Sequence, residues 1–160
     1  MDFSLEAKAR FMAAALAEGR KALPACQPNP PVGCVIVADG RILSRGFTGS
    51  PGAPHAEASA LASLSYTGSA ARLSAFVTLE PCAFQGRTPS CAAALVGLWI
   101  GSVFVGIVAT RIRETYGRGL RLLEDAGIHV ELGILEHEVR EFLAPLHCRY
   151  PYRLARISCT

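Results

Sequence analysis

Four residues in two short segments of the sequence could together carry out metal-assisted hydrolysis. His55 and Glu57 close the segment Pro54-His-Ala-Glu57, and Cys82 and Cys91 bracket a polar stretch further along the chain. One His and two Cys supply three ligands for Zn²⁺ and leave a fourth position open for water, which separates a catalytic zinc from a closed structural one. Zinc lowers the pKa of its bound water to about 7, so hydroxide becomes available at neutral pH.

Glu57 has the spacing of a proton carrier. It follows His55 by two positions, so it can approach the metal-bound water without entering the coordination shell. A carboxylate placed there can take the proton of the water and pass it to a departing amine. His-x-Glu, then Pro-Cys, then a later Cys is the order found in zinc nucleobase deaminases, although their signature closes with Cys-x-x-Cys and here eight residues separate the cysteines. A lone His or Pro-Cys is usually structural, but the combination predicts a catalytic zinc site.

The elements that must position these residues alternate between helix and strand, which predicts an α/β layer architecture. Apolar residues at helical spacing predict a helix over 3–19 that ends at Gly19, and Asp39-Gly40 between two apolar runs predicts a hairpin. His55 and Cys91 are then expected near helix N-termini, whose positive potential favours thiolate over thiol. The further helices are predicted over 55–65, 90–99, 120–126 and 136–146, and the strands over 34–37, 41–44, 75–79, 102–108, 128–132 and 152–157.

The composition is that of one folded domain. Hydrophobic residues make up 51% of the chain and charged residues 18%, which argues against disorder. No apolar run approaches the ~20 residues of a membrane span, and charges interrupt the first twenty residues where a secretory signal would be apolar. We therefore expect a cytoplasmic protein without a membrane partner, in which residues 1–150 form a zinc-dependent deaminase domain and 151–160 a tail with an edge strand.

Charge and cysteine content restrict the partners. A formal charge of +3 is too small to indicate nucleic-acid binding. Arginines cluster late in the chain, from Arg111 to Arg156, where they form either a solvated or oligomer-facing surface or a pocket for a phosphorylated substrate. Six cysteines in a reducing compartment are not a disulfide framework. The four outside the zinc pattern are expected to be free thiols: Cys26, Cys34, Cys148 and Cys159.

The sequence resembles the cytidine-deaminase-like superfamily and, more closely, the deaminase domain of the bifunctional riboflavin-biosynthesis deaminase/reductase. The resemblance implies a three-layer α/β/α sandwich with a mixed five-stranded sheet, zinc on His55, Cys82 and Cys91, proton transfer by Glu57, and a homo-oligomer, either dimer or tetramer. It rests on Pro28-Asn-Pro-Pro-Val-Gly-Cys-Val-Ile-Val37, His55-Ala-Glu57, Thr78-Leu-Glu-Pro-Cys82, Gly86-Arg-Thr-Pro-Ser-Cys91, Gly117-Arg-Gly-Leu120 and Ala126-Gly-Ile128.

The resemblance also implies the substrate contacts. By position, Asn29 contacts the substrate and Arg87 lies near its phosphate. The family commonly has a His at two positions and an Asp-Pro-Asn-Pro stretch that this chain lacks. These departures predict that the reaction persists on a changed substrate, an aminopyrimidine or related N-heterocycle that could carry a phosphate. The positions concerned are Thr48, Phe84, Ala109 and Arg111.

Three alternatives stay open. The chain could be a single-domain diaminohydroxyphosphoribosylaminopyrimidine deaminase of riboflavin biosynthesis. A nucleic-acid deaminase would need a basic stripe with stacking aromatic residues, and this chain has one Trp and no such stripe. A non-catalytic zinc scaffold, paired with a separate reductase, would have no use for Glu57. The sequence stops near Pro151–Ile157, where the family's reductase would begin, so we expect no nicotinamide-dependent reduction.

Overall fold

A five-stranded mixed sheet organises the protein, whose computed structural model describes residues 3–84, 89–108 and 117–147. The strands lie in the order β2-β1-β3-β4-β5. Strand β1 is antiparallel to both β2 and β3, whereas β3, β4 and β5 are parallel to one another. The predicted mixed five-stranded sheet is therefore confirmed. The strands span Gly33–Ala38 (β1), Arg41–Phe47 (β2), Ser74–Leu79 (β3), Ser102–Ile107 (β4) and His129–Leu132 (β5).

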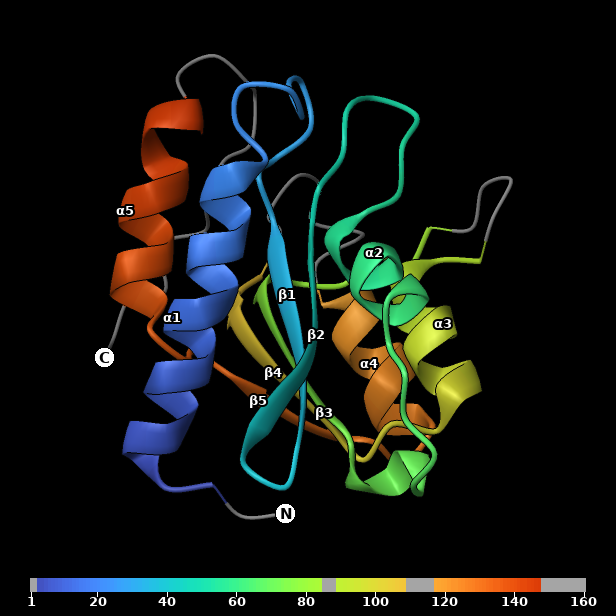
Figure 1. Ribbon diagram of the computed structural model, residues 1–160. Helices are drawn as coiled ribbons and strands as arrows, with labels where there is room; N and C mark the ends of the chain where they lie inside the picture. The colour runs from blue at the N-terminus through green and yellow to red at the C-terminus, as the bar shows by residue number, and fades with distance from the viewer. Residues whose placement is uncertain (1–2, 85–88, 109–116, 148–160) are drawn as a thin grey trace.

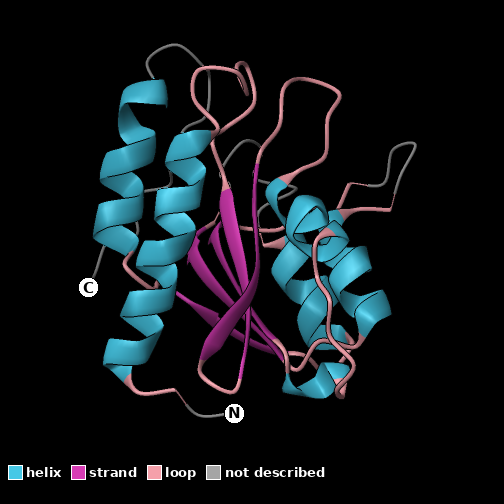
Figure 2. Ribbon diagram, viewed as in Figure 1, coloured by secondary structure: helices cyan, strands magenta, loops and turns pink. Residues whose placement is uncertain are grey.

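Helices cover both faces of the sheet, so the predicted three-layer sandwich is also confirmed. Figures 1 and 2 show α1 and α5 side by side on one face, and α2, α3 and α4 on the other. Each face buries its own apolar cluster, because side chains alternate along β1 between the two. No helix in the described ranges has the length and apolar character to cross a membrane. The helices span Leu5–Lys21 (α1), Ala56–Ala62 (α2), Cys91–Leu98 (α3), Arg118–Asp125 (α4) and Glu136–His147 (α5), and a short 3₁₀ turn spans Ala70–Arg72.

The hairpin between β1 and β2 forms where the sequence predicts it. Asp39 and Gly40 both have positive φ, 51° and 73°, which is the backbone of a type I′ turn. This turn matches the right-handed twist of the flanking strands, and Asp-Gly is among the pairs that adopt it most readily. Strand β2 continues to Phe47, three residues beyond the predicted end.

The predicted end of the first helix at Gly19 is wrong, because α1 continues to Lys21. Gly19 is buried inside the helix, where a Cβ would lie 2.9 Å from the carbonyl oxygen of Pro31 and 3.1 Å from the amide nitrogen of Gly33. The missing side chain therefore permits a close helix–strand approach and does not mark a helix end.

Two other helices differ from their predicted bounds by more than one residue. Helix α2 ends at Ala62, before the predicted Ser65, and the Ser63 hydroxyl at its C-cap lies 3.2 Å from the carbonyl oxygen of Ser59. Helix α4 begins at Arg118, two residues earlier than predicted. The strand predicted over 152–157 lies outside the described residues.

Gly46 sets the distance between α2 and the sheet. A Cβ there would lie 2.2 Å from the carbonyl oxygen of Ala56 and 2.4 Å from the amide nitrogen of Ala60. Both atoms belong to the backbone of α2, which cannot move aside as a flexible side chain could. The first turn of α2, which follows His55 and contains Glu57, is thus placed by direct backbone contact with β2.

We expect Gly46→Ala to lower the free energy of unfolding by at least the ~1–3 kcal/mol typical of overpacking, because α2 must shift. Gly97→Ala is the matched control, since Gly97 lies in α3 with open space around the added methyl group. Removing that glycine from a helix should stabilise the protein by roughly 0.5–1 kcal/mol. Urea unfolding measures both, and equal midpoints for the two variants would contradict the close contact.

Candidate active site

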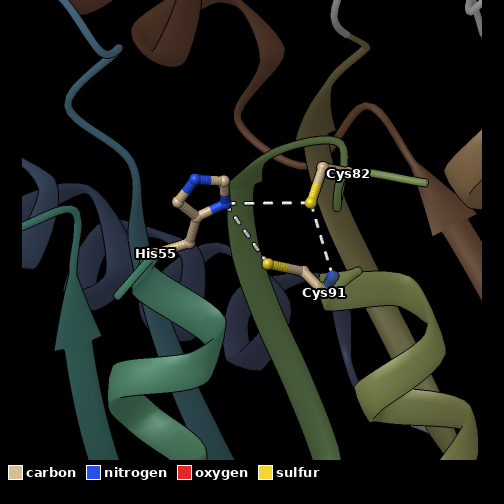
Figure 3. A group of neighbouring side chains, drawn as sticks. All are labelled: His55, Cys82 and Cys91. Carbon is tan, nitrogen blue, oxygen red and sulfur yellow. Dashed lines mark hydrogen bonds between the residues drawn. The ribbon is translucent and has the colours of Figure 1, made fainter. Parts of the chain in front are cut away.

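Three side chains from separate segments point toward one another at one end of the sheet (Figure 3). His55 is the N-cap of α2, Cys82 follows the end of β3, and Cys91 is the first residue of α3. The Nδ1 atom of His55 lies 3.7 Å from Sγ of Cys82 and 3.4 Å from Sγ of Cys91. The three donor atoms all lie within 4.8 Å of one another.

The spacing of these atoms fits a tetrahedral zinc ion. Zinc bonds of about 2.3 Å to sulfur and about 2.0–2.1 Å to nitrogen place tetrahedral N and S ligands about 3.6 Å apart. The two nitrogen–sulfur distances, 3.7 Å and 3.4 Å, lie on either side of that value. The donor set is also the soft nitrogen–sulfur set that zinc prefers. The group is thus suited to hold zinc with little rearrangement.

The N-terminus of α3 carries Cys91 and donates hydrogen bonds to Cys82. Ser90 caps the helix by accepting a hydrogen bond from the amide of Ala93. The amide of Cys91 donates to Sγ of Cys82 at 3.3 Å, and the amide of Ala92 donates to the Cys82 carbonyl at 3.1 Å. Cys82 therefore uses helix N–H groups that would otherwise lack a partner, and the positive helix end favours its thiolate.

The two thiols have opposite pKa shifts. The hydrogen bond from the Cys91 thiol is the main cause that lowers the pKa of Cys82 to about 4. The same hydrogen bond, together with burial, raises the pKa of Cys91. These directions favour a thiolate at Cys82 and a thiol at Cys91. Because zinc binds thiolates, loading the site should release the proton of the Cys91 thiol.

Glu57 lies in the first turn of α2, with 4% of its surface exposed. Burial is the main cause that raises its pKa to about 7, and the charge of Cys82 adds to the rise. A carboxyl group with a pKa near neutrality can both accept and return a proton at physiological pH. Burial raises the pKa of Cys34, and the charge of Glu57 adds to the rise. The predicted burial of Cys34 is confirmed, and both it and Cys26 are free thiols.

The structure describes three of the six predicted substrate-contact residues. Asn29 is half-buried, and its backbone N–H donates to the carbonyl of Cys26. Thr48 is buried and its hydroxyl accepts a hydrogen bond from the Val32 amide at 3.0 Å. Phe84 is 82% exposed, two residues after Cys82. Their roles toward a substrate stay predictions. Three further positions lie outside the described residues: Arg87, Ala109 and Arg111.

The sequence alone indicates no role for Glu80, which lies inside the motif Thr78–Cys82. Its carboxylate is buried and accepts hydrogen bonds from the amides of Gly117 at 3.3 Å and Gly119 at 2.9 Å. Glu80 belongs to the motif Thr78–Cys82, and the two glycines belong to the motif Gly117–Leu120. Almost forty positions separate the two motifs in the sequence. No local pattern pairs them.

A zinc-ligand group at the end of a mixed sheet, with a buried glutamate beside it, defines a class of zinc hydrolase. Residues 5–107 match the cytidine and deoxycytidylate deaminase zinc-binding region, and the chain belongs to that family. The riboflavin biosynthesis protein RibD of Escherichia coli is 38% identical over 146 residues, which cover 89% of this chain and 39% of RibD.

Solved structures support the same placement. A diaminohydroxyphosphoribosylaminopyrimidine deaminase/5-amino-6-(5-phosphoribosylamino)uracil reductase from Thermotoga maritima matches with a TM-score of 0.80 and 36% identity, over 88% of this chain and 40% of that one. The Aspergillus oryzae Rib2 deaminase in complex with DARIPP has a TM-score of 0.68 over 88% of this chain and 92% of that one, and at 22% identity it shows the shared fold alone. The chain spans about two fifths of the length of the curated relatives it matches.

The site predicts about one tightly bound zinc per chain. Cys91→Ser should lose most of this zinc, because a hydroxyl group is a much poorer zinc ligand than a thiolate. Cys34→Ala is the control, as it removes another buried thiol that is not one of the three converging donors. Elemental analysis after dialysis against a mild chelator measures the zinc content. Full occupancy in Cys91→Ser would show that Cys91 is not a ligand.

Proposed function

We propose that this chain is a zinc-dependent hydrolytic deaminase that removes an exocyclic amino group from an aminopyrimidine and releases ammonia. The observation that carries the proposal is Glu57, a buried carboxyl group placed by the same helix start as His55. A structural zinc site has no use for such a group. Three ligands with a fourth position left for water are also the arrangement of a catalytic zinc.

In this proposal His55, Cys82 and Cys91 hold the metal, and Glu57 moves the proton. Zinc, when bound, supplies a nucleophilic water at neutral pH. The Glu57 carboxylate accepts a proton from the attacking water as its oxygen bonds to the ring carbon. The carboxylic acid then returns this proton to the amino nitrogen, and the C–N bond breaks to release ammonia. The remaining hydroxyl proton moves to the adjacent ring nitrogen, which leaves a ring carbonyl. Burial keeps the pKa of Glu57 near the range in which both transfers are feasible.

The diaminopyrimidinone ribosyl phosphates are the substrate class best supported. The relatives with 36–38% identity are RibD proteins or carry this deaminase activity in their names. Asn29 and Arg87 retain the residue types that the resemblance assigns to substrate and phosphate. A different heterocycle is the second candidate, and a specific observation favours it. The exposed ring of Phe84, two residues after Cys82 in the sequence, offers a flat apolar face where the family commonly has a hydrogen-bonding imidazole.

A kinetic comparison separates the two candidates. Ammonia release from the diaminopyrimidinone ribosylamine phosphate should exceed that from other aminopyrimidines and aminopurines by orders of magnitude in kcat/KM, since losing buried polar contacts can cost that much discrimination. Faster turnover of a different heterocycle would identify that heterocycle as the substrate and contradict the first candidate. Absence of ammonia release from every aminated heterocycle, with zinc bound, would contradict a deaminase.

Glu57→Gln should lower kcat by the ~10²–10⁴-fold typical of a lost general acid/base, because the amide cannot take a proton from water. Its size and shape are nearly those of the native side chain, so zinc content and unfolding free energy should change little. Steady-state ammonia release and elemental analysis on the same sample measure both effects. Turnover within a few fold of the wild type would mean that another group carries the proton.

We also propose that the enzyme is cytoplasmic and works as a dimer or tetramer without nucleic acid. The described free thiols suit a reducing compartment, and the oligomer is implied by the family resemblance. Light scattering on the purified protein measures its mass. A monomer at micromolar concentration would contradict the oligomer without affecting the proposed chemistry.

A further inference from the structure

Two motifs that the proposed reaction does not use meet beside the zinc-ligand group. The first contains Glu80 and Pro81, directly before Cys82, and the second is Gly117-Arg-Gly119 at the start of α4. One carboxylate oxygen of Glu80 accepts from the Gly117 amide at 3.3 Å, and the other accepts from the Gly119 amide at 2.9 Å. Both hydrogen bonds are buried, so water does not weaken them.

Glu80 acts as a cap for α4 from a distant part of the chain. The N-cap of α4 is Gly117, at φ 69°, which has no side chain with which to satisfy the first helix amides. The Glu80 carboxylate takes this role, and its negative charge is stabilised by the positive end of the helix. Hydrogen bonds from amides to a carboxylate are also stronger than those to a neutral acceptor.

The backbones make an equally close contact. A Cβ at Gly119 would lie 1.9 Å from the carbonyl oxygen of Pro81, so α4 touches the chain at the residue before the metal ligand. The neighbouring residues are fixed as well. The Glu80 amide donates to the Ile107 carbonyl at the end of β4, and the Cys82 carbonyl accepts from α3 at 3.1 Å. Residues 80–82 are therefore held by β4, α4 and α3 in turn.

We infer that Glu80 is a positioning residue for the metal ligand Cys82, acting through its hydrogen bonds to the start of α4. This inference rests on the zinc site of the proposed function. Cys82 lies in a segment outside the helices and strands, whereas His55 and Cys91 are placed by helix starts. Such a segment needs tertiary contacts to hold its sulfur at bonding distance from an ion. Supporting contacts around metal ligands commonly account for 10–100-fold in metal affinity.

Glu80→Gln tests the inference. The amide offers one acceptor oxygen, so its NH₂ group must face one of the two helix N–H donors and leave that donor unsatisfied. Glu18→Gln is the matched control, because Glu18 is similarly buried (4% against 8% exposed) and accepts hydrogen bonds from Lys21 and Arg45 away from the zinc-ligand group. Both variants should lose stability in urea.

Metal readouts distinguish positioning from stability alone. Cobalt(II) replaces zinc and reports thiolate coordination through its charge-transfer and ligand-field absorption. Glu80→Gln should alter this spectrum and release zinc to a chelator on the order of 10-fold faster than the wild type. Glu18→Gln should match the wild type in both readouts. Gly119→Ala, which opens the same contact from the α4 side, should behave as Glu80→Gln does and serves if the latter fails to fold.

A Glu80→Gln protein with the wild-type cobalt spectrum and zinc release rate would overturn the inference, whatever its stability. So would a Glu18→Gln protein with an equal change in both readouts, because the effect would then follow from lost stability. If the wild type binds neither metal, the proposed zinc site is itself wrong and the inference falls with it. The two failures are therefore told apart by the wild-type protein alone.

Discussion

One metal ion must be reached by three side chains from three separate segments, and the rest of the structure serves that geometric demand. The donors of His55, Cys82 and Cys91 lie within 4.8 Å of one another although no two of them share a helix or strand. The distance from each ligand atom to the ion can vary by only a few tenths of an ångström at such a site. The sheet satisfies this requirement because it brings the end of β3 and the starts of α2 and α3 to one edge, where open α/β sheets bind their ligands.

The same edge creates the electrostatics that the proposed chemistry needs. The start of α3 favours a thiolate at Cys82, while burial raises the pKa of Glu57 to about 7. The start of α2 positions two of the functional residues at once. His55 is its N-cap, and Glu57 lies in its first turn. A buried carboxyl group is a cost to folding. Retaining it is consistent with a role in proton transfer.

The sequence predicts the fold and the chemical groups well, because both depend on local signals. Helical and strand periodicity predict the layers, Asp39-Gly40 predicts the hairpin turn, and ligand types predict the donor set. Long-range contacts are where the prediction fails. Gly19 is the residue type expected at a helix end, yet it lies inside α1, where it permits a close backbone contact with Pro31. Helix α4 starts early because Glu80 caps it from almost forty residues away, and no local pattern contains that information.

X-ray absorption at the zinc edge of the purified protein tests the central claim most directly, because it counts ligands by element and distance. The account predicts two sulfur ligands at about 2.3 Å and two nitrogen or oxygen ligands at about 2.0–2.2 Å, one of them the imidazole of His55 and one exchangeable. A first shell of four sulfur atoms, or one without sulfur, would contradict a catalytic site built from His55, Cys82 and Cys91.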